Sequence, residues 1–540
     1  LRYDYRTQTV VNTSYDMSLL DRQVSIRTAL TDHKGNIYIG TSGRGVFIIP
    51  KGSRRLQPVE SIHPKFDLAS ANVNALFEDK DHNLWASCYN KGLYLLSEGK
   101  NAFSSWLFST QAIRLGSSVS SIAPADEGGV WCTVQKSGIY HFDAHGNITD
   151  KRLSPEGANT IYRDRQGRYW VGTENALYRY YPSNGSSQLC LKLDGWGVNY
   201  ICDDGQGSLF VSNYAKGFVI YDTKTGKSRS FSMQHDNKKL GKLHNDWAKT
   251  MLYDRQGRLW IACADGLSCM NPKTGNFRIN GWETLFDGRQ CLSLCQLRQS
   301  NTMLIGTENG LYQLSEGQKA PQRFPNSDNL ADKSIYAIVQ DADGDLWMST
   351  SMGIWQYDHK SKKLISYIGG NGLTTTEYVI GTQIHTSDDR IFFGINDGVT
   401  TFLPKAVKAS NQAIGRVFLT RMVVNGKERG CQSRQFDLGY DDNTFSLGFS
   451  LLNYRNTNNI TFQYRIGKQG AWEAFPEGSN VITFNKMKPG TYRIEVRATT
   501  GGAYSAHSAV VTVRVNNPWY ASTWAWLTYI LAATGIVAFA

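Results

Sequence analysis

Short apolar stretches alternate with polar turns along the first 404 residues, and their order repeats. An apolar segment such as VNALFED or IYAIVQD precedes a turn with Asp and Gly, a second segment such as LWIA or YWVG, and a third that ends in Tyr. A final polar run such as DTKTGKSRSFS indicates a hairpin into a fourth, outer strand. Gly supplies positive φ in the first turn, and Asp can bond its own backbone two residues on. The pattern therefore predicts four-stranded antiparallel units.

The clearest mark of each unit is the motif D-x-x-G-x-(hydrophobic)-W. A period in the mid-forties, built from short strands and tight turns, is typical of β-propeller blades. One blade cannot cover both its faces, so we expect these aromatic side chains to pack between neighbouring blades. Nine copies, 39 to 50 residues apart, are centred on Tyr38, Trp85, Trp131, Trp170, Phe210, Trp260, Leu304, Trp347 and Phe392.

The number of repeats exceeds one ring, because propellers usually have about four to eight blades. The opening LRYDYRTQTVV also resembles the end of a tenth unit. We therefore expect a complete seven-bladed propeller over residues 103–404, preceded at residues 1–102 by the last blades of an incomplete one. A single larger ring is the alternative. We expect the chain to be part of a longer protein, since no signal segment precedes Leu1.

The pattern changes at residues 405–515, where strands of alternating character are separated by turn residues, as in ITFQYRIG and TYRIEVRAT. About 110 residues of such strands indicate an immunoglobulin-like β-sandwich. From Trp524 to Ala540 no charged residue occurs, and Trp and Tyr gather at the start of this stretch. The sequence thus predicts the start of a transmembrane helix at residues 522–540. The expected fold class is all-β: tandem β-propellers, a β-sandwich and this helix.

The net charge of +12 suggests nucleic acid or an acidic polysaccharide as a partner, so its location matters. Residues 1–404 carry 43 basic and 39 acidic side chains, whereas residues 405–540 carry 15 and 7. Most of the excess lies beside the predicted membrane segment, where it can face anionic lipid. No nucleic-acid motif accompanies it, so we expect this region to bind no nucleic acid.

Motifs for catalysis and metal binding are missing from the sequence. It has no G-x-S-x-G, H-E-x-x-H or P-loop, and its ten histidines lack metal-ligand spacing. DADGDLW at Asp341 resembles the start of a calcium loop, but Met352 stands where an EF-hand needs Glu. We expect no catalytic residue, no metal and no cofactor. Paired carboxylates from different blades leave a glycosidase or lyase as an alternative.

A binding surface is the remaining candidate. In a propeller, the loops between second and third strands share one face with the loops that enter first strands. Aromatic rings flanked by Lys, His and Asn donors suit a sugar that carries carboxylate or sulfate. In the alternative interpretation, Trp196 and Trp247 fill contacts in the ring and the lysines are merely solvated. The predicted ligand-binding residues are Arg44, Lys91, Lys136, Trp196, Asn213, Tyr214, Lys216, His244, Asn245 and Trp247.

Together these parts resemble the regulator-propeller repeats of hybrid two-component sensors, N-x-(V/I)-x-x-(I/L)-x-x-D-x-x-G-x-L-W-(I/V)-G-T-x-x-G-L-x-x-Y. The segment GLTTTEYVIGTQIHTSDDRIFFGINDGVTTFLP is similar to the closing blade of that family. Residues 416–515, with FSLLNYRN and KPGTYRIEVRA, resemble its triple-tyrosine domain. Several repeats depart from the consensus by lacking the turn Gly, near Asn83, Asn301 and Asp389.

The resemblance implies the periplasmic sensor region of an inner-membrane hybrid histidine kinase that controls glycan-utilisation genes. It implies an oligosaccharide ligand, dimerisation through the sandwich, and kinase activity only in the full-length protein. Known members sense neutral glycans or glycosaminoglycans through differing positions, so no ligand residue is carried over. A sensor of the same architecture for a non-carbohydrate envelope ligand, and a propeller glycosidase or lyase, are the alternatives.

Overall fold

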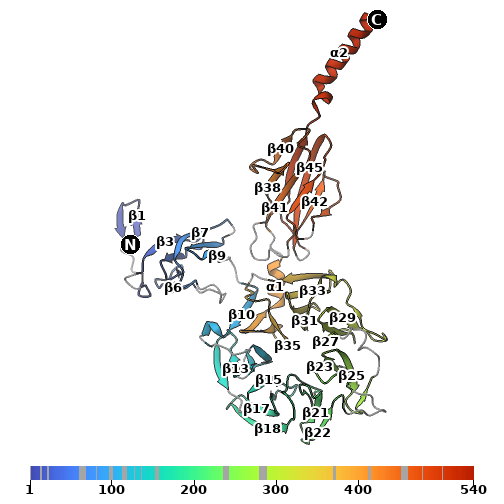
Figure 1. The fold of residues 1–540 in the computed structure, drawn as a ribbon. Helices are drawn as coiled ribbons and strands as arrows, with labels where there is room; N and C mark the ends of the chain where they lie inside the picture. Colours follow the sequence, from blue (N-terminus) through green and yellow to red (C-terminus); the bar gives the residue numbers. More distant parts are fainter. Residues whose placement is uncertain are drawn as a thin grey trace. The chain divides into compact units, whose positions relative to one another are not determined.

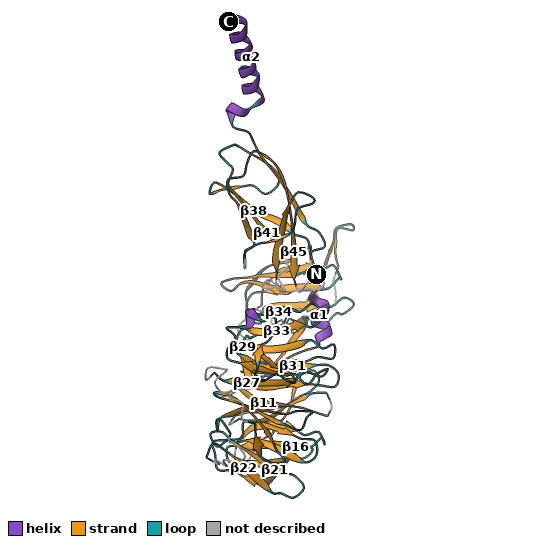
Figure 2. Ribbon diagram, turned by 90° about the vertical axis from the view of Figure 1, so that its right-hand side faces the viewer, coloured by secondary structure: helices purple, strands orange, loops and turns teal. Residues whose placement is uncertain are grey.

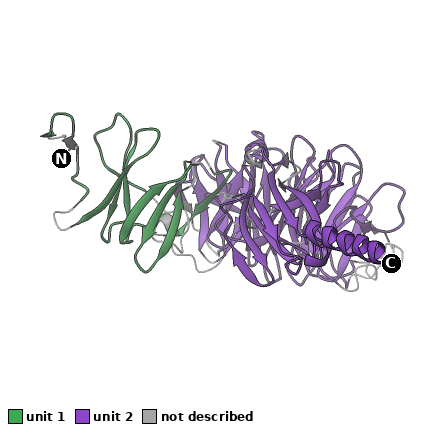
Figure 3. Cartoon of the chain, turned by 90° about the horizontal axis from the view of Figure 1, so that it is seen from above, with its two compact units in different colours: residues 1–114 green, residues 115–540 purple. Residues whose placement is uncertain are grey.

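The regular secondary structure of the described residues is mostly β-strand, and its two α-helices follow the last ring strand in sequence (Figure 2). It divides into two compact units, residues 1–114 and 115–540 (Figure 3). The computed structural model describes residues 2–11, 15–20, 24–59, 68–80, 82–96, 101–111, 113, 118–126, 128–135, 137–152, 157–234, 243–278, 289–368, 372–411, 415–451, 460–476, 478–500 and 503–540.

The first unit contains propeller-like sheets. Strands β3 to β6 form one antiparallel sheet, strands β7 to β9 form the next, and their first strands pack side by side. Strands β1 and β2 form a separate hairpin. The strands of this unit are β1 Arg2–Asp4, β2 Thr9–Val11, β3 Ile26–Thr31, β4 Ile37–Thr41, β5 Val46–Ile49, β6 Gln57–Pro58, β7 Val73–Glu78, β8 Leu84–Cys88, β9 Gly92–Leu96 and β10 Phe103–Leu107.

The second unit opens with seven successive sheets, counted over the described residues, arranged as a ring (Figure 1). In the first six, four strands pair in chain order, and β35 to β37 build the seventh. The ring closes because β35 packs beside β11.

The ring strands lie within the following bounds. They are β11 Val119–Pro124, β12 Val130–Val134, β13 Gly138–Phe142, β14 Ile148–Arg152, β15 Ala158–Arg163, β16 Tyr169–Thr173, β17 Ala176–Tyr181, β18 Ser186–Lys192, β19 Ile201–Asp203, β20 Ser208–Ser212, β21 Phe218–Asp222, β22 Ser228–Phe231, β23 Ala248–Tyr253, β24 Leu259–Cys263, β25 Gly266–Asn271, β26 Asn276–Phe277, β27 Cys291–Gln296, β28 Met303–Thr307, β29 Gly310–Leu314, β30 Gln322–Arg323, β31 Ile335–Gln340, β32 Leu346–Thr350, β33 Gly353–Asp358, β34 Lys363–Tyr367, β35 Tyr378–His385, β36 Ile391–Ile395 and β37 Gly398–Phe402.

The repeated motif is explained by the hydrogen bonds of its Asp. Asp164 Oδ1 accepts from the backbone N–H of Gln166 at 3.0 Å and closes the turn, while its Oδ2 accepts from Trp170 Nε1 at 2.8 Å. Trp170 is 2% exposed and meets Tyr221 of the next sheet edge to face, at 6.2 Å between ring centroids. The tryptophans thus pack between blades, as expected. The same bond, from the indole to the Asp six residues earlier, recurs at Trp85, Trp260 and Trp347.

A two-layer β-sandwich follows the ring. One sheet has the order β39-β38-β41-β44, and the other has the order β40-β47-β45-β42-β43 with β46 beside β45. Phe445, Phe449, Ile494 and Val511 are among its fully buried core residues. The bounds are β38 Phe418–Val424, β39 Lys427–Arg429, β40 Gln435–Leu438, β41 Phe445–Ser450, β42 Thr461–Ile466, β43 Glu473–Ala474, β44 Val481–Phe484, β45 Gly490–Thr500, β46 Ala503–Tyr504 and β47 Ala509–Val515.

Two α-helices flank the sandwich in sequence, α1 Pro404–Asn411 and α2 Thr523–Phe539. The hydroxyl of Ser522 caps α2 by accepting from the backbone N–H of Ala525 at 3.2 Å. Among the helices of the described residues, none has both the length and the apolar character needed to cross a membrane. The all-β fold class predicted from the sequence is confirmed, while the exact domain boundaries stay predictions.

Candidate functional site

The predicted binding surface centres on the turn between β20 and β21. The turn closes through backbone hydrogen bonds, with Lys216 N donating to Asn213 O and Asn213 N donating to Gly217 O, both at 2.9 Å. Two of its residues have positive φ, Ala215 at 60° and Gly217 at 80°. A Cβ at Gly217 would lie 2.0 Å from the carbonyl oxygen of Phe231, so only glycine fits.

This turn is fastened to the loops on either side of it. The backbone N–H of Tyr214 donates to Gly197 O at 2.9 Å, and that of Gly217 donates to Asp246 O at 3.0 Å. The first bond reaches the loop that enters β19, and the second reaches the loop that enters β23. The side chains of three separate loops are therefore presented together on one face of the ring.

Aromatic side chains dominate this surface. The rings of Tyr214 and Trp247 are stacked, with centroids 5.3 Å apart and an angle of 29° between their planes. Trp247 is nevertheless 44% exposed, and Trp196 is 76% exposed. Both tryptophans therefore present apolar surface to solvent, and Trp247 also contacts the Tyr214 ring of a neighbouring loop.

Polar and charged groups surround the aromatic pair. Lys249 Nζ lies 6.0 Å from the centroid of the Trp247 ring, within reach of a cation–π interaction. His244 Nε2 lies 3.4 Å from Asp265 Oδ2. Asn245 Oδ1 accepts from the backbone N–H of Trp247 at 2.7 Å, which fixes the loop that carries the tryptophan.

A hollow of about 340 Å³ adjoins the turn, which is large enough for a small ligand. Asn213 and Lys216 line it, together with the loop carboxylate Asp194. Asn213 is fixed there because its Nδ2 donates to Asp194 O at 3.3 Å, and a Cβ at Gly195 would lie 1.8 Å from its Oδ1. The other lining residues are Leu191, Lys192, Leu193, Ala215, Val219, Ser228, Ser230, Ser232, Gln234 and Asp246.

Burial also determines which groups near this surface can react. Burial raises the pKa of the Cys263 thiol, at the end of β24, to about 12. It likewise raises the pKa of Tyr200, in the loop that enters β19, above its ordinary value. Both groups therefore stay protonated at neutral pH, so neither supplies an anionic nucleophile.

Seven of the ten predicted residues gather at this surface: Trp196, Asn213, Tyr214, Lys216, His244, Asn245 and Trp247. Arg44 and Lys91 lie in the first unit, where Lys91 Nζ donates to Ser70 Oγ at 3.0 Å. Lys136 lies outside the described residues. Sequence reasoning missed the polar lining from β22 and from Ser232 just after it, although the alternation of Ser228 and Ser230 places both serines on one face of the strand.

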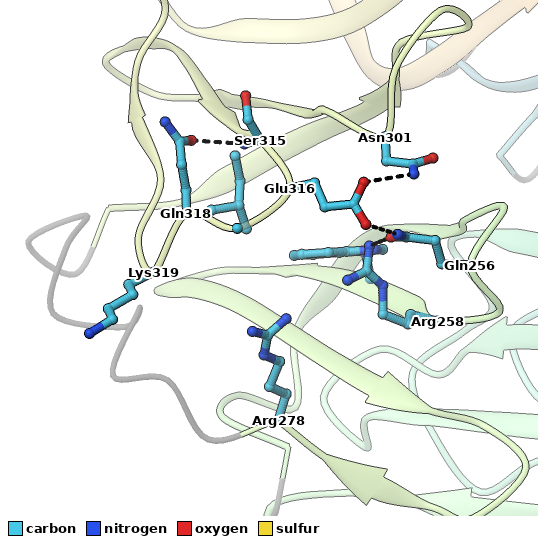
Figure 4. Close-up of a pocket in the computed structure, with 11 residues that line it drawn as sticks. Gln256, Arg258, Arg278, Asn301, Ser315, Glu316, Gln318 and Lys319 are labelled. Carbon is cyan, nitrogen blue, oxygen red and sulfur yellow. Dashed lines mark hydrogen bonds between the residues drawn. The ribbon is translucent and has the colours of Figure 1, made fainter.

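A larger hollow of about 550 Å³ lies on the opposite face, among the D-x-x-G turns (Figure 4). Glu316 extends between two neighbouring repeats there, accepting from Gln256 Nε2 at 3.1 Å and from Asn301 Nδ2 at 3.0 Å. Arg258 Nε donates to Asp254 at 2.7 Å and its guanidinium lies over the buried Trp260. These groups bond one another across the blades, which indicates a structural role rather than a ligand site.

Comparisons with known proteins agree with this architecture. Residues 67–90, 152–175 and 329–352 match the family described as two component regulator propeller, and residues 453–516 match the Y_Y_Y domain. The extracellular domain of a hybrid two component system from B. thetaiotaomicron has the same fold, with a TM-score of 0.74 and 19% identity over 95% of this chain and 70% of that one.

A full-length relative is also similar. Histidine kinase P4 of Formosa agariphila is 22% identical over 486 residues, 83% of this chain, and the chain spans about a third (35%) of its length. The family resemblance predicted from the motifs is confirmed. The chain contains two component regulator propeller repeats, and a Y_Y_Y domain follows them.

Proposed function

We propose that this chain is the periplasmic sensor region of a hybrid histidine kinase and that it binds an oligosaccharide at the Trp196–Tyr214–Trp247 surface. The observation that carries the proposal is the exposed, stacked pair of Tyr214 and Trp247 beside a polar hollow. Flat aromatic faces offer apolar planes to the C–H faces of sugar rings, while the hollow offers hydroxyl, amide and charged groups to sugar oxygens.

Three lysines at this surface can bind an anionic substituent of a sugar. Lys216 and Lys192 line the hollow, and Lys249 stands over Trp247. The carboxylates of Asp194 and Asp246 also line the hollow, although Asp246 Oδ1 already accepts a hydrogen bond from the backbone N–H of Met233 at 2.7 Å. Ammonium groups contribute strong charge-assisted hydrogen bonds to carboxylate or sulfate. These lysines support an acidic oligosaccharide of glycosaminoglycan type as the ligand.

The test is isothermal titration calorimetry of the purified chain against a panel of neutral and acidic oligosaccharides. We expect Trp247→Ala to weaken binding at least about tenfold, equivalent to about 1.4 kcal/mol, because it removes half of the aromatic platform. Lys216→Ala should weaken the acidic ligands more than the neutral ones. Trp519→Ala is the matched control, since Trp519 is 81% exposed and lies outside these loops.

Unchanged affinity in both Trp247→Ala and Lys216→Ala would remove the proposed site. Binding of no glycan in the panel would favour the non-carbohydrate sensor, and cleavage of a glycan in a turnover assay would favour the glycosidase or lyase. The experiment therefore distinguishes the three classes of function.

Signalling is proposed to run through a dimer of the sandwich into the membrane. A bound ligand can favour one arrangement of the dimer over another only if its contacts with the protein differ between the two arrangements. The Asn516-Asn517-Pro518 link is short, so a change in the sandwich would be passed to the segment that begins at Thr523 and, in the full-length protein, to the kinase. Crosslinks introduced near Pro518 should form to different extents with and without ligand; equal yields would contradict this mechanism.

A further inference from the structure

His33, Glu78 and His82 form a compact cluster in the first unit. Glu78 Oε1 lies 2.5 Å from His33 Nδ1 and 3.1 Å from His82 Nδ1. The two imidazole rings are stacked, with centroids 3.7 Å apart and 27° between their planes. One ligand atom from each residue lies within 4.8 Å of the other two. Three potential metal ligands thus converge on one point.

The cluster joins two neighbouring sheets. His33 lies in the turn between β3 and β4, whereas Glu78 ends β7 and His82 lies in the turn that follows. The backbone N–H of His33 also donates to Glu78 Oε2 at 3.0 Å. The carboxylate is therefore held by the neighbouring sheet before any further partner binds.

His82 occupies a backbone position that favours glycine. Its φ is +63°, and it stands where the other D-x-x-G turns have glycine, as at Gly35, Gly167 and Gly257. A residue with a Cβ pays roughly 1–2 kcal/mol for this conformation, and such strain concentrates at functional sites. The backbone is therefore strained at His82, and the His82 imidazole faces Glu78 and His33.

The hydrogen bonds around Glu78 favour the ionised form of its carboxylate, which is the form that binds a metal ion. Burial acts to raise the pKa of Glu78, but hydrogen bonds from His33 and His82 outweigh it and lower the pKa below its ordinary value. The Glu78 side chain is 16% exposed, and those of His33 and His82 are 30% and 47% exposed. The cluster is thus reachable from solvent while its carboxylate stays ionised.

We propose that His33, Glu78 and His82 bind a divalent transition-metal ion, with Zn²⁺ the best match. Two imidazoles and one carboxylate are a recognised Zn²⁺ ligand set, with bonds of about 2.0–2.2 Å and a fourth position open to water. Imidazole selects such ions over Mg²⁺ and Ca²⁺, which prefer oxygen ligands. Bound there, the ion cross-links two adjacent sheets of the first unit. The two histidines come from different repeats, which explains why their spacing in the sequence shows no metal motif.

The test is titration of the whole, tag-free chain with Co²⁺ and Zn²⁺ at pH 7.5, followed by the Co²⁺ visible spectrum and by calorimetry. We expect one equivalent to bind with the absorption of a tetrahedral site, and the transition of the first unit on heating to shift upward with metal. His82→Gly removes one ligand and restores the usual turn residue, so it should weaken binding at least about tenfold without loss of fold. Glu78→Gln removes the carboxylate ligand and should also weaken metal binding at least about tenfold.

The matched control is His145→Gln, because His145 is an exposed histidine in a turn of the second unit. We expect this variant to bind metal as the wild type does. Absence of stoichiometric binding to the wild type would overturn the proposal, as would wild-type metal affinity in both His82→Gly and Glu78→Gln.

Discussion

The ammonium group of Lys408 contacts three carboxylates at once. It extends from α1 to the turn between β31 and β32, where its Nζ lies 3.0 Å from Asp341, 3.0 Å from Asp343 and 2.8 Å from Asp345. The aspartate spacing that resembled a calcium loop in the sequence thus surrounds a lysine. Burial lowers the pKa of Lys408, but hydrogen bonds to Asp345, Asp341 and Asp343 outweigh this and raise it above its ordinary value, so the charge persists.

Replacing Lys408 by Met should destabilise the second unit by about 3–5 kcal/mol, the usual cost of removing one partner from a buried ion pair. The side chains of Asp341 and Asp345 are 0% and 4% exposed, so water cannot compensate them. Asp343 is 46% exposed and adds at most about 1 kcal/mol. Most of the loss therefore comes from two buried carboxylates that lose their lysine partner.

The assay is urea denaturation of the wild type, Lys408→Met and the control Lys405→Met. Lys405 is exposed on the same helix, so its replacement removes an equal charge without uncovering a buried carboxylate. Ca²⁺ at millimolar concentration should restore part of the lost stability in Lys408→Met and in no other variant, because three carboxylates then face a vacated cation position. A loss in Lys408→Met no larger than in Lys405→Met would refute the reasoning.

Three further predictions follow from local geometry. Trp170→Phe removes the N–H that Asp164 accepts and should cost about 1–3 kcal/mol in urea denaturation, whereas Trp196→Phe, at an exposed position, should cost almost nothing. Gly217→Ala should be more destabilising than Gly226→Ala by about 1 kcal/mol or more; both have positive φ, but only at Gly217 does the Cβ meet backbone, and equal losses would contradict the close approach. The pKa of Glu495 is lowered to about 2 because, although burial raises it, hydrogen bonds from Ser508, Arg465 and Arg493 outweigh this. Its stabilising effect is present above the ordinary pKa and is lost as the pH falls through the range from about 4.5 to 2, so Glu495→Gln should flatten the acid unfolding curve of the sandwich in that window; an unchanged curve would contradict it.

The propeller could be predicted because its signal is local. Asp164, Gly167 and Trp170 lie within seven residues and complete a turn, a positive φ and an indole hydrogen bond by themselves. Each repeat can therefore be recognised from its own residues. The grouping of Trp196, Tyr214 and Trp247 could also be predicted from the sequence, because corresponding loops of adjacent blades lie on the same face of the ring.

Contacts between side chains of different repeats could not be predicted in the same way. Whether His33 meets Glu78, or Lys408 meets Asp341, depends on the spacing and rotation of whole sheets and on where a following helix turns back. No periodicity in the sequence encodes those quantities. The same limit left the serines of β22 outside the predicted site, although their alternation was visible.

The two faces of the ring differ in how their turns are held, and this difference supports the proposed place of the binding surface. On the D-x-x-G face, side chains such as Asp254 and Glu316 hold the turns and bridge the blades, so we expect their replacement to destabilise the ring. On the other face, the turn from Asn213 to Gly217 is closed by backbone hydrogen bonds. The side chains of Tyr214 and Lys216 are therefore not needed to close it. Side chains there can vary in chemistry at little cost in stability. Lys216→Ala should therefore lower affinity while leaving the free energy of unfolding within about 0.5 kcal/mol of the wild type. Trp247→Ala should lower affinity and also cost about 0.5–1.5 kcal/mol in the free energy of unfolding, because it removes the ring stack with Tyr214.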